Sequence, residues 1–482
     1  MKRLNKYVLD EKLKIGSDRP EKIIQFGEGN FLRAFIDEMV DTINEKELFN
    51  GSIVVIQPIK NGLIDILNEQ DGLYTLFLRG MENGKEICKK RVITSISRGI
   101  NPYKDYDAYM KCAENEDLSF VISNTTEAGI VFLDSDNLED KPQISFPGKV
   151  TAFLYKRYRH FNGDKTKGLV FIPCELIDNN GTELKTQILK FASKWNLESE
   201  FITWVNEDNI FTNTLVDRIV TGYPRDEAKA LTEELGYEDK LLDTGEIFHF
   251  WVIDGPDFLS EELPFVKAFL NVVWTDDATH YKMRKVRILN GAHTASVLAA
   301  FLAGKETVGE MIADEIFHRY LKIALFEEII PTLDLDYEDL RSFANAVFDR
   351  FANPYIKHFL LNIALNSVSK YKTRVLPSIL EYYKRKNSHP KVLTFSMAAL
   401  IAFYRGDEAK DDAFVIETFR KEYEECDLSK VSIEKLVGKI LRNEIFWGMD
   451  LTTLPDFCEK VSEHLFNIFD KGVMSEVKNL IC

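Results

Sequence analysis

The fold is decided by a stretch near the N-terminus, Lys22-Ile23-Ile24-Gln25-Phe26-Gly27-Glu28-Gly29-Asn30. Its apolar first half is typical of a short buried strand, and its glycine-rich second half breaks that strand before an amphipathic run at residues 31–46. Another apolar run, at residues 53–56, follows at the distance that a βαβ unit requires. Strand, glycine turn, helix and strand together predict the start of a doubly wound α/β domain.

The alternation of helices and strands continues through the first 275 residues. Two β-rich runs flank Asn83-Gly84, a dipeptide favoured in tight hairpin turns, so we expect a hairpin inserted in this domain. Further helix and strand pairs are expected at residues 103–115 and 118–122, and at residues 150–159 and 169–172. A mostly parallel sheet in a Rossmann-type domain at residues 1–275 is therefore predicted.

The remaining chain, residues 276–482, is predicted to form a mainly α-helical domain. Helical periodicity replaces the β-rich runs after Trp274, and a polar stretch at residues 275–281 marks the join. Helices are expected at residues 285–303, 306–327, 337–350, 355–368 and 391–404.

Composition excludes several classes of protein. Apolar residues make up 45% of the chain and charged residues 29%, as in folded globular proteins. A formal net charge of −16 disfavours nucleic acid as a partner. The six cysteines show no CxxC or CxxxC pair, which argues against structural zinc and disulfides. The first ten residues lack the apolar core of a secretory signal, and no apolar stretch approaches the roughly 20 residues of a membrane span, so a cytoplasmic location is expected.

The glycine turn is a candidate nucleotide site. Without a Cβ atom, Gly27 and Gly29 let the backbone approach a pyrophosphate at the start of a helix. Leu32 stands where a full G-x-G-x-x-G motif has its third glycine, so an ordinary strand-to-helix turn is the alternative. The second strand ends in Gln57-Pro58 rather than in a ribose-binding carboxylate, and nearby Lys60 could meet a 2′-phosphate, so these residues leave NAD and NADP both open.

A polar loop, Ser123-Asn124-Thr125-Thr126-Glu127, follows the predicted strand at residues 118–122. Ligands on open α/β sheets gather at the carboxyl ends of strands, so this loop is a candidate border of a nicotinamide ribose. A polar connector without a binding role is the alternative interpretation.

Three polar residues mark a candidate catalytic helix. Arg287 is the only charged residue between Val286 and Gly304, so most of this helix should be buried. At about 100° per residue, Lys285, Asn290 and His293 fall on one arc. A desolvated lysine serves as general acid or base, and the other two could donate hydrogen bonds to a carbonyl oxygen without a metal. A core histidine and asparagine satisfied by backbone groups are the alternative.

These residues also carry a resemblance to a known family. The chain resembles the polyol-specific long-chain dehydrogenases, the mannitol dehydrogenase family, over nearly its whole length. The resemblance rests on four segments: Ile24-Gln25-Phe26-Gly27-Glu28-Gly29-Asn30-Phe31-Leu32-Arg33-Ala34-Phe35, Thr126-Glu127, Leu215-Val216-Asp217-Arg218-Ile219 and Arg284-Lys285-Val286-Arg287-Ile288-Leu289-Asn290-Gly291-Ala292-His293-Thr294.

The resemblance implies a metal-independent oxidoreductase that uses NAD and acts on a small sugar acid as a monomer or homodimer. It assigns acid/base and carbonyl-polarising roles to Lys285, Asn290 and His293. The implied substrate-binding residues are Asp217, Arg350 and Lys370, the last two as cations suited to a carboxylate. A solvated helix face is the alternative interpretation of Arg350 and Lys370. The implied cofactor-binding residues are Phe26, Gly27, Gly29, Asn30, Phe31, Asn124, Thr126 and Glu127.

One family feature is missing, because Leu176 stands where the family has an asparagine that assists the oxyanion site. Two alternatives to the sugar-acid reductase stay open. One is a family member with the same three catalytic residues and another substrate, such as a different sugar acid or a polyol. The other is a protein that senses NAD(H) without turnover, which would have no need of Lys285, Asn290 and His293 on one arc.

Overall fold

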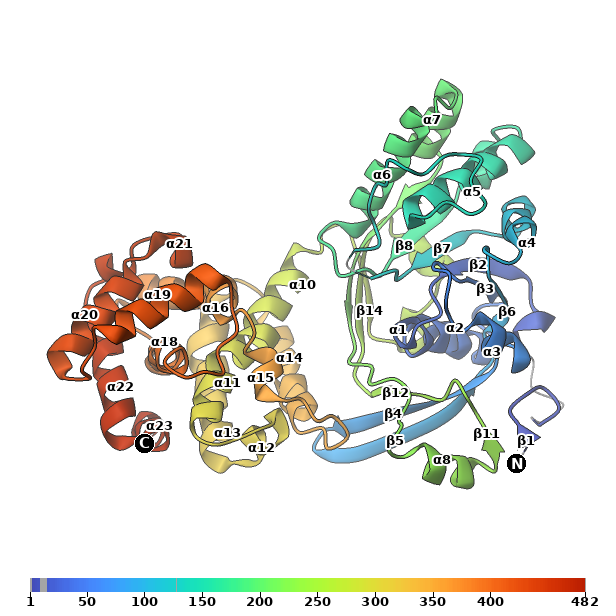
Figure 1. The fold of residues 1–482 in the computed structure, drawn as a ribbon. Helices are drawn as coiled ribbons and strands as arrows, with labels where there is room; N and C mark the ends of the chain where they lie inside the picture. The colour runs from blue at the N-terminus through green and yellow to red at the C-terminus, as the bar shows by residue number, and fades with distance from the viewer. Residues whose placement is uncertain (1, 9–14, 127, 482) are drawn as a thin grey trace. The chain divides into compact units, whose positions relative to one another are not determined.

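The computed structural model describes residues 2–8, 15–126 and 128–481. It divides into two compact units (Figure 1). The first comprises Met1–Arg79 and Ile87–Ala278, and the second comprises Gly80–Glu86 and Thr279–Cys482. The tip of the inserted hairpin is therefore part of the second unit, although it was expected with the first. The reason is a pair of hydrogen bonds in which the backbone N–H groups of Asn83 and Gly84 donate to the Asp349 carboxylate.

The first unit is built on a six-stranded parallel sheet with the order β6-β3-β2-β7-β8-β9. If these six strands are numbered 1 to 6 in the order in which they follow one another along the chain, their order across the sheet is 3-2-1-4-5-6. This is the arrangement of a Rossmann fold, so the predicted fold class is confirmed. The strand order reverses between β2 and β7. The strands are β2 (Glu21–Phe26), β3 (Ser52–Ile56), β6 (Ile96–Ile100), β7 (Phe120–Ser123), β8 (Val170–Pro173) and β9 (Ile210–Phe211).

Helices cover both faces of this sheet because successive side chains of each strand point to opposite sides. Ile23 and Ile53 belong to one buried apolar cluster, whereas their neighbours Ile24 and Val54 belong to another. The first cluster is covered by α2 (Ile36–Glu45) and α3 (Ile64–Glu69). The second is covered by α4 (Tyr106–Lys111), α5 (Phe146–His160), α6 (Asn180–Lys194) and α7 (Ser199–Glu207).

Smaller sheets and helices complete the first unit. The predicted hairpin is present, and Asn83 and Gly84 have φ values of 52° and 72°, as its tight turn requires. A three-stranded sheet joins β4 (Tyr74–Glu82) and β5 (Lys85–Ile93) to β12 (Asp243–Glu246). Another joins β10 (Asn213–Asp217), β13 (Phe250–Asp254) and β14 (Val272–Thr275). The remaining elements are β1 (Lys2–Arg3), which pairs with β11 (Tyr237–Glu238), and helices α8 (Ala228–Leu235) and α9 (Leu259–Glu262).

The helix expected at residues 31–46 is interrupted. It forms as α1 (Asn30–Arg33) and α2, separated by Ala34 and Phe35. The Arg218 guanidinium donates a 2.5 Å hydrogen bond to the Ala34 carbonyl oxygen. The Phe35 ring is buried against Phe31 and Trp251. These two tertiary contacts account for a break that helical periodicity does not reveal.

Outside the hairpin tip, all described elements of the second unit are helical. The helices expected at residues 337–350 and 391–404 form as α14 (Tyr337–Phe351) and α18 (Lys391–Phe403). The one expected at residues 306–327 is split into α12 (Val308–Ala313) and α13 (Glu315–Lys322), because Asp314 caps the second, and α13 continues as a π-helix at Ile323–Ile329. The segment expected at residues 355–368 is mostly loop, with α15 (Leu360–Ile363) and α16 (Ser367–Arg374) at its end. The others are α17 (Leu376–Lys386), α19 (Ala413–Glu424), α20 (Lys430–Leu441), α21 (Glu444–Trp447), α22 (Phe457–Lys471) and α23 (Val473–Ile481).

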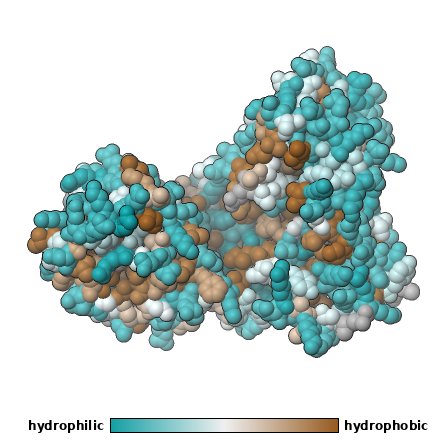
Figure 2. All heavy atoms as spheres, viewed as in Figure 1, coloured by the Kyte–Doolittle hydropathy of each residue, from teal (hydrophilic) through white to brown (hydrophobic). Residues whose placement is uncertain are grey.

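The predicted catalytic helix is not uniformly α-helical. It consists of α10 (Thr279–Arg284), a π-helix at Lys285–Asn290 and α11 (Gly291–Leu302). A π-helix turns by a smaller angle per residue than an α-helix, so the angles calculated for a regular helix do not apply to its first half. Within the described residues, no helix is long and apolar enough to cross a membrane. Much of the visible face of each unit is hydrophilic (Figure 2), in keeping with a chain that is 29% charged.

Candidate functional site

The predicted cofactor residues meet at the point where the strand order reverses. Phe26 ends β2 and is paired with Ser123, which ends β7. The pairing continues one step further, because the Asn124 N–H donates to the Phe26 carbonyl oxygen at 3.1 Å. The glycine turn and the Asn124 loop therefore lie side by side at the carboxyl ends of adjacent strands, the usual place for a ligand in this fold. Thr126 is exposed, and Glu127 lies outside the described residues.

The two glycines of the turn have different surroundings. Gly27 has a φ of +121°, and a Cβ atom there would stand 3.0 Å from the Asn124 carbonyl oxygen. The first position therefore needs glycine for the fold itself. Gly29 precedes α1, and a Cβ atom there would meet no atom within 4 Å. The open space beside Gly29 fits the close approach of a ligand such as a pyrophosphate.

Asn30 and Phe31 form the first turn of α1 and differ in their surroundings. Phe31 stacks on Phe35, with ring centroids 5.0 Å apart. The Asn30 side chain is exposed, and its Oδ1 accepts a 2.6 Å hydrogen bond from Arg33 Nη2. At the end of β3, the Gln57 amide donates to the carbonyl oxygens of Ile59 and Lys60. This loop again offers no carboxylate for a ribose.

In the second unit, Lys285 and Asn290 are the first and last residues of the π-helix, and His293 lies in the first turn of α11. All three residues are partly exposed. Short π-helical segments are often found at functional sites. The structure thus places the three predicted catalytic residues on one continuous helical stretch, and their chemical roles stay predictions.

The His293 imidazole is held by aromatic neighbours. It stacks on Phe351, with ring centroids 4.3 Å apart and an interplanar angle of 18°, and His358 meets it edge-on at 5.3 Å. Its Nε2 atom is buried and has no hydrogen-bond partner among the described residues. Burial lowers the His293 pKa well below its usual value, and nearby positive groups lower it further. A neutral imidazole with a buried, unpartnered nitrogen is suited to donate a hydrogen bond to a carbonyl oxygen.

Four groups act on His293: the cations Arg350, Lys370 and Arg374, which form a cationic cluster, and His358, whose own pKa is lowered by burial and by Arg350. The two predicted substrate cations, Arg350 and Lys370, are thus brought to His293. Sequence reasoning missed the other two, although Arg374 lies one helical turn after Lys370 on α16. Burial and then the positive charge of Arg374 lower the Lys370 pKa. The positive charge of Arg374 beside Lys370 makes an anion favourable there.

Two other predicted positions lie in the first unit. Asp217 is buried at the end of β10, so its proposed contact with substrate stays a prediction. Leu176 follows β8 and is 62% exposed. Nearby Asn180 does not replace the missing asparagine. Its amide nitrogen donates to the carbonyl oxygens of Pro173 and Glu175, and its oxygen accepts from the Gly181 and Thr214 N–H groups.

A metal was not expected, and the described residues contain no group of three or more His, Cys, Asp or Glu side chains that could hold one. Activity without a metal stays a prediction. The described cysteines, Cys88, Cys112, Cys174, Cys426 and Cys458, are unbridged.

Two family models match the chain. The mannitol dehydrogenase Rossmann domain matches residues 21–267, and the mannitol dehydrogenase C-terminal domain matches residues 277–469. Altronate oxidoreductase of Bacillus subtilis strain 168 is 47% identical over 98% of this chain and 97% of its own length. Altronate oxidoreductase of Escherichia coli O139:H28 is 47% identical over 96% of this chain and 98% of its own length.

Solved structures show the same fold at lower identity. The ternary complex of Pseudomonas fluorescens mannitol 2-dehydrogenase with NAD and D-mannitol is 23% identical, with a TM-score of 0.66 and coverage of 99% of both chains. Substrate-free D-sorbitol dehydrogenase is also 23% identical, with a TM-score of 0.79 and coverage of 99% of this chain and 100% of the other.

Proposed function

We propose that this chain, which belongs to the mannitol dehydrogenase family, reduces tagaturonate to altronate and catalyses the reverse oxidation. The observation that carries this proposal is the cationic cluster around His293, because a sugar acid has a carboxylate that a neutral polyol lacks. The name of the 47% identical relatives, altronate oxidoreductase, points to the same substrate.

We propose NAD as the cofactor and the first unit as its binding domain. The glycine turn fits a dinucleotide, because Gly29 leaves open space at the carboxyl end of β2. Phe26 to Phe31 and Asn124 with Thr126 would hold the pyrophosphate and the nicotinamide half. When bound, reduced NAD supplies a hydride. The second unit would then be the substrate-binding domain.

The residues of the second unit have separate roles in this proposal. Lys285 gives a proton to the oxygen of the reduced carbonyl and takes it back in the oxidation. Asn290 and His293 donate hydrogen bonds to the same oxygen as negative charge develops on it. The Arg350 guanidinium and the Lys370 ammonium bind the carboxylate of the sugar acid, with Arg374 adding positive potential.

The test is an NADH absorbance assay with the purified protein and a panel of tagaturonate, fructuronate and fructose. We expect turnover of tagaturonate and none of fructose, and full activity after dialysis against a chelator. Faster turnover of fructuronate would assign the chain to another sugar acid. Comparable turnover of fructose would show that the enzyme does not need a carboxylate on its substrate. NADH binding without any turnover would indicate a sensing protein. Activity that is lost on dialysis and restored by zinc would contradict the assignment of Asn290 and His293.

A further inference from the structure

Asn30, in the proposed cofactor site, lies between Arg33, its neighbour one helical turn along α1, and Gly222, which is distant in sequence. On one side, Arg33 Nη2 donates to its Oδ1 at 2.6 Å. On the other side lies Gly222, where an added Cβ atom would clash with Asn30 Nδ2. The side chain is exposed to solvent, and the hydrogen bond from Arg33 orients its oxygen.

Arg33 decides which way the Asn30 amide faces. A guanidinium has five N–H donors and no acceptor, so it must face the amide oxygen. The NH2 group is then directed elsewhere, and it has no hydrogen-bond partner among residues 2–8, 15–126 and 128–481. Arg33 is 3% exposed, and its Nη2 lies 3.5 Å from Asp243 Oδ2. Burial beside Asp243 therefore leaves Arg33 little room to follow a rotation of Asn30.

Gly222 is fixed by hydrogen bonds to Thr244, the residue after Asp243. The N–H groups of Thr221 and Gly222 both donate to the Thr244 carbonyl oxygen, at 2.9 and 3.1 Å. The Thr244 N–H and hydroxyl donate back to the Gly222 carbonyl oxygen, at 3.1 and 2.7 Å. Asp243 and Thr244 are the first two residues of β12, so one strand contacts both Arg33 and Gly222, the two neighbours of Asn30.

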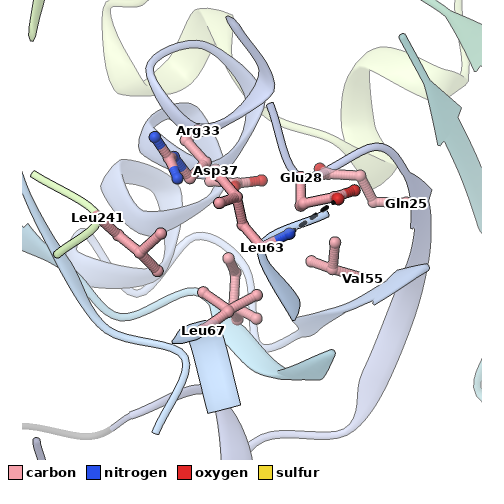
Figure 3. A pocket seen from close by; sticks show the side chains of 9 residues that line it. Gln25, Glu28, Arg33, Asp37, Val55, Leu63, Leu67 and Leu241 are labelled. Carbon is pink, nitrogen blue, oxygen red and sulfur yellow. Dashed lines mark hydrogen bonds between the residues drawn. The ribbon is translucent and has the colours of Figure 1, made fainter. Parts of the chain in front are cut away.

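Figure 3 shows the buried side of this arrangement, where Arg33 lies close to Asp37 among Gln25, Glu28 and apolar side chains. The Glu28 carboxylate accepts a 3.2 Å hydrogen bond from the Leu63 N–H in the same view. These groups are buried, with Glu28 8% and Asp37 0% exposed. Asn30 is the polar residue that extends from this buried network to the surface beside Gly29.

We propose that Arg33 and Gly222 are positioning residues that fix the Asn30 amide with its NH2 group directed at an anionic oxygen of the dinucleotide phosphates. This inference rests on the proposed function, because it takes the glycine turn as the cofactor site. An NH2 group is a hydrogen-bond donor and suits a phosphate oxygen, whereas the amide oxygen would repel it.

The first test compares Gly222→Ala with Gly236→Ala. The two glycines have φ values of +78° and +77°, so both alanines carry the same backbone strain. Only the first would displace Asn30, because a Cβ atom at Gly236 meets nothing within 4 Å. We expect Gly222→Ala to weaken NADH binding, measured by fluorescence titration, about tenfold or more, in line with the loss of a hydrogen bond to a charged group. The KM for the sugar acid should stay unchanged, and Gly236→Ala should bind NADH normally.

A second test uses the exposed residue itself and does not disturb the buried network. Asn30→Asp keeps an oxygen for Arg33 but places the other oxygen where the NH2 group was. It should bind NADH about tenfold more weakly than Asn30→Ala, because the carboxylate repels a phosphate. In the Asn30→Ala background, Gly222→Ala should add no further loss, since the clash is gone.

The outcomes separate the two proposals. A wild-type protein that does not bind NADH would overturn the proposed function. A wild-type protein that binds NADH, together with equal affinities for Gly222→Ala and Gly236→Ala, or for Asn30→Asp and Asn30→Ala, would overturn the positioning role alone. If Gly222→Ala fails to fold, the comparison of Asn30→Asp with Asn30→Ala decides.

Discussion

The imidazole of His293 lies nearly parallel to the ring of Phe351, with the two centroids 4.3 Å apart. His293 is on α11 and Phe351 is the last residue of α14, so the stack joins two helices that carry different parts of the candidate site. Arg350, the residue before Phe351, belongs to the cationic cluster. The orientation of the proposed carbonyl donor and the position of a proposed carboxylate ligand are therefore coupled through one aromatic contact.

Phe351→Leu tests this contact. An aromatic pair contributes about 0.5–1.5 kcal/mol beyond its buried area, so loss of the stack should lower kcat up to about tenfold by loosening the imidazole. The Kd for NADH should not change. Phe348→Leu is the matched control, because Phe348 lies on the same helix and stacks on Phe326 instead. Equal losses of kcat in the two variants would mean that the effect comes from α14 as a whole.

The glycine turn allows a separation of fold and binding. Gly29→Val should leave the melting temperature close to that of the wild type, because its Cβ position is open, but should weaken NADH binding strongly by blocking the approach to the backbone. Gly27→Ala should instead lower the melting temperature, since its φ is +121° and Asn124 is in the way. Thermal unfolding and fluorescence titration measure the two effects. A folded Gly29→Val protein with normal NADH affinity would place the cofactor elsewhere.

Much of this fold can be predicted from local pattern. The strands at β2 and β3 and the Asn83-Gly84 turn were predicted correctly because apolar runs and turn dipeptides act within a few residues. The break between α1 and α2 was missed because Arg218, far along the chain, binds the Ala34 carbonyl oxygen. The π-helices at Lys285–Asn290 and Ile323–Ile329 were missed because apolar periodicity does not distinguish them from α-helices in such short segments.

The residues of the candidate site likewise divide into those that local sequence pattern predicted and those that it did not. Lys285, Asn290 and His293 were singled out because they are polar residues close together on one helix. His358 and Arg374 were not, because their nearness to His293 is created by tertiary packing of a loop and of α16. The spacing of Lys370 and Arg374, four residues apart on α16, was the one signal available in the sequence.

Lys370→Met tests the carboxylate site. A hydrogen bond to a charged group contributes about 1.5–3 kcal/mol, so the KM for the sugar acid should rise about 10- to 100-fold, with the Kd for NADH unchanged. Lys372→Met is the control, because Lys372 lies on the same helix but is not among the groups that lower the His293 pKa. An equal rise of KM in both variants would mean that the loss of any positive charge on α16 weakens substrate binding, and that no specific contact with the carboxylate is lost.

Asp37→Asn tests the buried charges of the first unit. Burial raises the Asp37 pKa from 3.8 to about 7, so the folded protein binds a proton there that the unfolded chain does not. This group therefore contributes stability that is present at low pH and is lost as the pH rises toward about 7. Relative to the wild type, Asp37→Asn should be more stable at pH 8 than at pH 5. Chemical unfolding at both pH values measures the difference, with Asp65→Asn as an exposed control on α3. A stability difference that does not vary with pH would show that Asp37 keeps its charge in the folded state.

Lys285→Ala tests the proposed acid/base residue. General acid catalysis typically contributes roughly 10²- to 10⁴-fold, so kcat for reduction should fall at least about a hundredfold. NADH affinity should barely change, since the proposed cofactor residues lie in the first unit. Lys282→Ala, on α10 just before the π-helix, is the matched control and should retain most of the activity.

The pH profiles give the sharper criterion for Lys285. Alcohol oxidation needs the lysine neutral to accept a proton, so its rate should rise with pH through the lysine pKa. Ketone reduction needs the ammonium and should decline over the same range. The two profiles of the wild type should therefore be opposed, and both dependences should disappear in Lys285→Ala. If the variant kept near-normal turnover, or the same pH dependence of oxidation, Lys285 would be structural. The acid/base group would then have to be another residue, with His293 the first candidate.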